Sequence, residues 1–116
     1  MILPTYSDIH QNDVGTEFLA TIMKNVNGIE SPMDISKAVS KQIVIRKPDN
    51  TVLVRHAIFT PISSGALGTG VDGKLSYFSV PGDLDIRGTY RIQAVVTNPQ
   101  GKWFSSIDKF KVVGNL

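Results

Sequence analysis

The segment Thr89-Tyr90-Arg91-Ile92-Gln93-Ala94-Val95-Val96-Thr97-Asn98 decides the fold class of this chain. Apolar and polar side chains alternate along it, and one face would carry Tyr90, Ile92, Ala94 and Val96. A period of two is the pattern of a β-strand that buries one of its faces. The segment therefore predicts a strand that covers a hydrophobic core.

Three further segments alternate in the same way: Thr16–Met23, Lys41–Lys47 and Thr51–Thr60. The first two predict strands with one buried face, formed by Phe18, Ala20 and Ile22 and by Ile43 and Ile45. We expect the lysines at both ends of Lys41–Lys47 to lie in solvent. The third segment is less one-sided, with Leu53, Ala57 and Phe59 on one face and Val52, Val54 and Ile58 on the other.

Turn residues separate these segments at short intervals. Lys47–Thr51 contains Pro, Asp and Asn, Asn98–Gly101 contains Pro and Gly, and Asn25–Gly28 ends in Asn-Gly. These residues adopt turn conformations at low cost, so each segment predicts a tight turn. Pro61–Gly73 is rich in Gly and Ser, which predicts a long, mobile excursion between strands.

Helical patterns are confined to Asp34–Ala38 and Pro81–Asp85, and neither continues at helical spacing. The chain has 116 residues, with ten Gly and six Pro, which is enough for one domain with its own core. We therefore expect an all-β, antiparallel sandwich of about seven strands over residues 13–116. Residues 1–12 carry no clear pattern and are expected to form an N-terminal arm or a first edge strand.

Asp85, Gly88 and Tyr90 precede or begin the deciding strand in the pattern of a tyrosine corner. In immunoglobulin-like sandwiches this tyrosine hydroxyl bonds the backbone just upstream. Ile92 stands where antibody domains place a disulfide cysteine, so an antibody-type domain is excluded. The motif predicts an immunoglobulin-like β-sandwich with a buried Tyr90.

Seven motifs follow one another along residues 9–113: Asn12–Gly15, Asp34–Ser36, Ile43–Thr51, Asp72–Tyr77, Gly82–Asp85, Gly88–Gln93 and Gly101–Trp103. In this order they resemble the immunoglobulin-like module of phage tail and baseplate proteins, and the N-terminal domain of baseplate upper proteins is similar. Family members often have Gly in the hairpin where this chain has Asn50, which also tolerates a left-handed backbone.

The resemblance implies a structural protein of a phage virion, in a tail, tail tip, baseplate or fibre attachment. The implied partners are other phage structural proteins and further copies of the chain in a symmetric particle. The absence of Cys is compatible with folding in a reducing host cytoplasm before assembly. We expect residues 1–12 and 61–73 to be the principal partner contacts, through Leu3, Tyr6, Ile9, Ile62 and Leu67, and we expect Trp103 to be a further contact residue.

Composition argues against several other functions. The net charge is +2 and its basic residues are scattered, which is unlike a nucleic-acid-binding domain. No apolar run approaches the length of a membrane-spanning helix, so no membrane partner is expected. His10 and His56 are isolated in sequence, and no motif of a nucleophilic enzyme occurs. We expect neither enzymatic activity nor a cofactor.

Two alternatives remain open. Asp83 and Asp85, with Asp72, are spaced so that a cation site is conceivable, although a role in the turn is favoured. Trp103 and Phe104 are adjacent, so alternation would direct one ring inward and the other toward an edge or interface. A carbohydrate-binding or host-adhesion module would use Trp103, Tyr77 and loop carboxylates, and a capsid decoration protein is a third possibility.

Overall fold

The computed structural model describes the backbone of residues 2–4 and all of residues 9–116. Every regular element in this part of the chain is a β-strand, so the expected all-β class is confirmed. Within the same residues, no helix is long and apolar enough to cross a membrane.

Sheet A has the strand order β1-β3-β9-β8, and all of its strand pairs are antiparallel. Its strands are β1 (Ile2–Pro4), β3 (Glu17–Thr21), β9 (Lys74–Phe78) and β8 (Ile58–Phe59).

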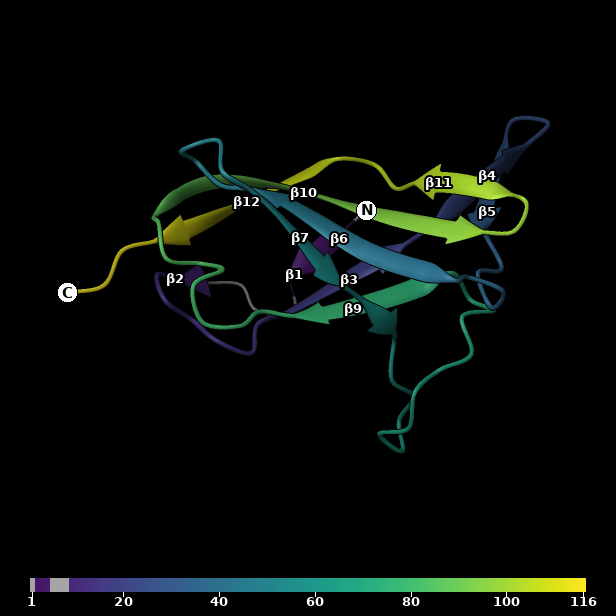
Figure 1. Cartoon of the computed structure of the whole chain (residues 1–116), viewed down its shortest axis with the longest axis horizontal. Coiled ribbons are helices and arrows are strands. Elements are labelled where there is room, and N and C mark those ends of the chain that lie inside the picture. Colours follow the sequence, from purple (N-terminus) through teal and green to yellow (C-terminus); the bar gives the residue numbers. More distant parts are fainter. Residues whose placement is uncertain (1, 5–8) are drawn as a thin grey trace.

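Sheet B has the order β2-β12-β10-β6-β7, with β11 also paired to β10. Its strands are β2 (Ile9–His10), β12 (Asp108–Val113), β10 (Gly88–Asn98), β6 (Ser40–Arg46), β7 (Val52–His56) and β11 (Gly101–Phe104). The β2–β12 pair is parallel, which departs from the expected all-antiparallel arrangement. Figure 1 shows β12, β10 and β6 of sheet B above β3 and β9 of sheet A, so these strands form two layers.

A hairpin of β4 (Met23–Val26) and β5 (Ile29–Pro32) projects from one end of these layers (Figure 1). Asn27 and Gly28 both have positive φ, of 55° and 82°, as a two-residue type I′ turn requires. The expected strand from Thr16 to Met23 thus ends early and continues into this hairpin. The described chain has twelve strands rather than about seven, because this hairpin and several two- to four-residue strands add to the long ones.

The core lies between the two sheets, where the deciding strand becomes β10. Its alternation is confirmed, since Tyr90, Ile92, Ala94 and Val96 are all buried. Phe18 of sheet A meets Phe110 of sheet B with ring centroids 4.8 Å apart. Sequence analysis missed β12, although Lys109-Phe110-Lys111-Val112 alternates as clearly as the other strands.

The described parts of residues 1–12 lie at the edges of the two sheets. Residues 2–4 pair with β3, and β2 pairs with the end of β12. Ile9 packs into the core, so the described parts of this segment extend both sheets. Residues 1 and 5–8 lie outside the described residues.

The tyrosine corner has the expected form. The Tyr90 hydroxyl donates a hydrogen bond to the Ile86 carbonyl, and the Ile86 N–H donates to the hydroxyl over 3.1 Å. Gly88 has a φ of 134°, and a Cβ there would come within 2.8 Å of the Pro48 ring. The corner therefore packs directly against the hairpin between β6 and β7.

Lys47, at the end of β6, is a correction to the sequence analysis. We expected it to lie in solvent, but its side chain is buried. Its ammonium group donates to Asp85 over 2.7 Å and to the Gly82 carbonyl over 2.8 Å. These two acceptors replace the water that the ammonium loses, which explains why a lysine is tolerated at this position.

Replacing Tyr90 by Phe keeps the ring stacked on Phe110 and removes both hydrogen bonds to Ile86. We expect Tyr90→Phe to lower the free energy of unfolding by about 1–3 kcal/mol, because the Ile86 backbone groups lose their partner. Urea denaturation followed by tryptophan fluorescence measures this change. The exposed Phe104→Tyr is the control, expected to stay within about 0.5 kcal/mol of wild type. An equal effect of both variants would contradict the corner's role.

Candidate interaction surface

The described residues among those expected to contact partners differ in their exposure to solvent. Leu3 belongs to the edge strand β1, where only the backbone is described, and Tyr6 lies outside the described residues. Ile9 is 3% exposed, so its side chain belongs to the core rather than to a contact surface. Ile62 and Leu67 are exposed on the loop between β8 and β9.

Trp103 and Phe104 point to opposite sides of sheet B, as alternation predicts. Trp103 lies opposite the buried Val96 and packs against the core. Phe104 is 56% exposed and lies opposite Val95 on the other side of the sheet. Phe104 is therefore the more exposed ring, and Trp103, the expected contact residue, is partly buried.

Three residues of the carbohydrate alternative are wholly or partly buried, although Asp72 and Asp85 are exposed. Trp103 is partly buried, Tyr77 is 6% exposed, and Asp83 has no exposed surface. A sugar-binding site needs aromatic faces and polar atoms that reach the ligand together. No observation on the described residues favours this alternative.

Asp83 is satisfied by protein groups. Its carboxylate accepts hydrogen bonds from the Tyr77 hydroxyl and from the Val80 N–H. The Arg55 guanidinium from β7 lies 3.0 Å from its other oxygen. These contacts use both carboxylate oxygens, so Asp83 ties β7 to the segment that leads into the tyrosine corner.

The other carboxylates of the suggested cation site have similar local roles. Asp85 pairs with Lys47, and Asp72 accepts a hydrogen bond from the Lys74 N–H. No group of three or more metal-ligating residues occurs among residues 9–116. The arrangement agrees with the interpretation that these residues serve turns. His10 and His56 lie on β2 and β7, at opposite edges of sheet B.

The outer face of sheet B carries a row of basic side chains that sequence analysis missed. Arg46 of β6 lies directly opposite Arg91 of β10, and Arg91 lies directly opposite Lys109 of β12. All three side chains are exposed, and none forms an ion pair with another described residue. Like charges at directly opposite positions repel each other. We call Arg46, Arg91 and Lys109 the basic row.

Apolar side chains flank the basic row on the same face. Val52 and Val54 of β7 are exposed, as are Phe104 of β11 and Ile107 of the following loop. Val95 is buried here although it does not belong to the core cluster, so its neighbours on this face cover it. The face thus combines uncompensated positive charge with exposed apolar surface.

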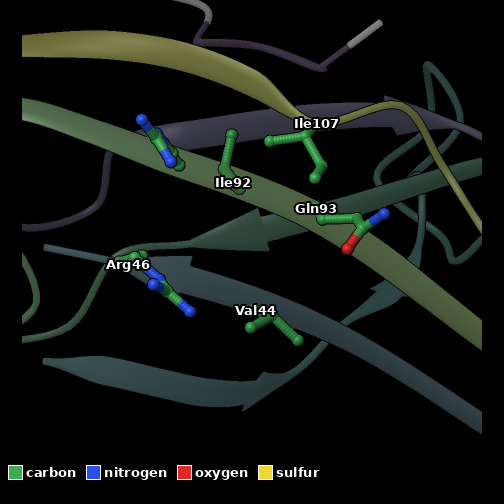
Figure 2. Close-up of a pocket in the computed structure, with 6 residues that line it drawn as sticks. Val44, Arg46, Ile92, Gln93 and Ile107 are labelled. Atoms are coloured by element: carbon green, nitrogen blue, oxygen red, sulfur yellow. The ribbon is translucent and has the colours of Figure 1, made fainter. Parts of the chain in front are cut away.

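Two shallow hollows lie along this face and share Arg46 and Arg91. One has a volume of about 260 Å³ and is bordered by Val44, Gln93 and Ile107 (Figure 2). The other, of about 190 Å³, lies between Lys109 and the hairpin of Pro48. Both hollows on this face therefore lie beside residues of the basic row.

The basic row could not be read from the sequence because its members lie on three strands that are distant in the chain. Only the strand register brings Arg46, Arg91 and Lys109 into line. Each of them does occupy the outward position of an alternating strand, which was the available signal.

Comparisons of this chain with protein families, curated proteins and solved structures find no match.

The contrast between Asp83 and Asp85 gives a matched pair of variants. Asp83→Asn leaves Arg55 without its buried carboxylate, and we expect a loss of about 1.5–3 kcal/mol in the free energy of unfolding. Asp85→Asn removes an ion pair in which the carboxylate is 45% exposed, while the amide oxygen and the Gly82 carbonyl remain as acceptors for the buried Lys47 ammonium, so a loss of at most about 1 kcal/mol is expected. Urea denaturation of both variants measures the difference. Equal losses would contradict the assigned role of Asp83.

Burial raises the pKa of Tyr77 and of Tyr90 above the ordinary value of 10.0, and for Tyr77 the bond to Asp83 raises it further. Because the folded pKa exceeds the unfolded one, this contribution to stability is complete below pH 10 and falls as pH rises above it. We expect ultraviolet titration to show delayed ionisation of both phenols in the native protein. Titration of both at the ordinary pKa would contradict their burial.

Proposed function

We propose that this chain is a non-catalytic interaction module that binds an acidic protein surface through the outer face of sheet B. The basic row carries this proposal. Repulsion among Arg46, Arg91 and Lys109 is a cost to the isolated domain. A partner that places carboxylates over the row would remove this cost and gain attraction at the same time.

The apolar neighbours of the basic row support a protein as the partner. Phe104 and Ile107 offer exposed apolar area beside the charges. Protein interfaces combine a desolvated apolar centre with polar and charged groups around it, and arginine and aromatic residues contribute much of their energy. The same face would hold both components.

We further propose that the two sheets form an immunoglobulin-like sandwich. Immunoglobulin domains pack a sheet of strands A, B, E and D against one of strands G, F and C, and variable-type domains add C′. The orders β1-β3-β9-β8 and β12-β10-β6-β7 follow these two series. The bonds between Tyr90 and Ile86 at the start of β10 support the same assignment.

A place in a phage tail or baseplate is the proposal that follows from the sequence resemblance. A small sandwich with a contact face suits repeated use in a symmetric particle, where many weak contacts act together. The exposed loop with Ile62 and Leu67 would supply a second contact region.

Incorporation into particles tests this function. A tagged copy of the chain is expressed in cells that carry the gene for this chain and produce phage particles. The particles are then purified and probed for the tag. We expect wild type in the particles and at least a tenfold loss for Arg46→Glu/Arg91→Glu, because acidic side chains would repel the partner.

The control is Lys37→Glu/Lys74→Glu, which makes the same change of charge at two exposed lysines outside the outer face of sheet B. It should be incorporated like wild type. Wild type missing from particles would overturn the phage assignment. Normal incorporation of Arg46→Glu/Arg91→Glu would overturn the role of the basic row.

A further inference from the structure

The strand β7 forms an open edge of sheet B. It pairs with β6 on one side, and no other strand of the described chain pairs with it. Lys47 and Thr51 share a hydrogen bond at one end of the β6–β7 pair, and Lys41 and Ala57 share one at the other. In an antiparallel pair such bonded positions alternate with positions whose backbone groups point outward.

The register therefore fixes which groups of β7 face the edge. Val44 and Val54 are opposite each other, and counting from the bonded ends places Val52, Val54 and His56 at the outward positions. The N–H and C=O groups of these three residues lie along the open edge. Their side chains are exposed on the outer face of sheet B.

Other sheet edges carry features that discourage pairing with another chain. Pro4 lies in β1 and Pro32 in β5, and proline lacks the N–H that a ladder needs. β12 presents Lys109 and Lys111, and β2 and β8 have two residues each. Short strands, proline and lysine are the usual protections of an edge. β7 has five residues without Pro, Gly or Lys.

We propose that β7 pairs antiparallel with β7 of a second copy of this chain, about a two-fold axis at Val54. Val54 would then face Val54 of the second copy, and Val52 would face its His56. Each of these pairs places outward N–H groups against outward C=O groups, so the outward groups of all three residues can be bonded to the second copy. Leu53 and Arg55 keep their bonds to β6, and β7 is then hydrogen-bonded along both of its edges.

The side chains favour a second copy as the occupant of this edge. Val54 would meet a valine, and Val52 a histidine, so β-branched side chains meet at the axis. Arg46 lies opposite Val52, and Gln42 lies opposite His56. Across the paired edge, Arg46 and Val52 of one copy would therefore be followed by His56 and Gln42 of the second copy. No like charges would lie directly opposite each other.

Arg55 does not obstruct this pairing, although a charged residue pointing inward can protect an edge. Its guanidinium is held by Asp83 of its own chain, with Nε 3.1 Å from the carboxylate. The interface is isologous, so pairing closes at a dimer rather than growing into a filament. This inference goes beyond the proposed function, because it depends on the backbone of β7 and not on the basic row.

Sedimentation equilibrium of the full chain over a concentration series, from about 10 μM to 1 mM, tests the inference. A single paired strand is a small interface, so we expect reversible dimerisation toward twice 12.7 kDa at the upper concentrations. A chain that stays monomeric throughout would overturn the proposal.

Three variants at Val54 assign the interface. Val54→Pro removes the outward N–H without removing a bond to β6, and Val54→Lys places like charges at the axis. We expect both to weaken dimerisation at least tenfold, while Val54→Thr, which keeps the N–H and the branched shape, dimerises like wild type. If Val54→Pro fails to fold by circular dichroism, Val54→Lys decides alone. A dimer that survives Val54→Lys would overturn the assignment.

Amide hydrogen exchange provides an independent measurement. The N–H groups of Leu53 and Arg55 point to β6 and should be protected at every concentration. Those of Val52, Val54 and His56 should become protected only as the dimer forms. Dimerisation without this change would place the interface elsewhere and overturn the proposal.

Discussion

Asp83 carries its charge with no exposed surface, in the connection that leads from sheet A to sheet B. A buried carboxylate is tolerated only when donors replace its water, and here Tyr77, Val80 and Arg55 do so. Tyr77 comes from β9 of sheet A and Arg55 from the edge strand of sheet B. One carboxylate therefore joins the two layers, and the Tyr90 corner is built on the connection that it fixes.

The two faces of sheet B have different roles. Tyr90 and Ile92 of β10 are buried in the core, whereas Arg91, between them in sequence, faces solvent in the basic row. Burial on the inner side provides the stability that offsets repulsion on the outer side. A sandwich can thus present an unfavourable arrangement of charges because its core does not depend on that surface.

Alternation predicted the inner face well, because burial of side chains with a period of two is a local property of β10, β6 and β3. The corner was predictable too, since Asp85, Gly88 and Tyr90 lie close together in sequence. The partners of Lys47 and Asp83 were not, because these contacts join residues that only the folded connection brings together. The burial of Ile9 and the basic row were missed for the same reason, because the pairing of β2 with β12 and the strand register of sheet B determine them.

The hairpin of β4 and β5 adds no residue to the core cluster, and its Asn27-Gly28 turn needs nothing from the rest of the chain. Its strands bond only to each other within the described structure. The core therefore does not depend on the sequence of this hairpin. Substitution of Val26 or Ile29 beside the turn, or a change in the length of the hairpin, would leave the core intact. The hairpin could therefore change in sequence while the two sheets and their core stay the same.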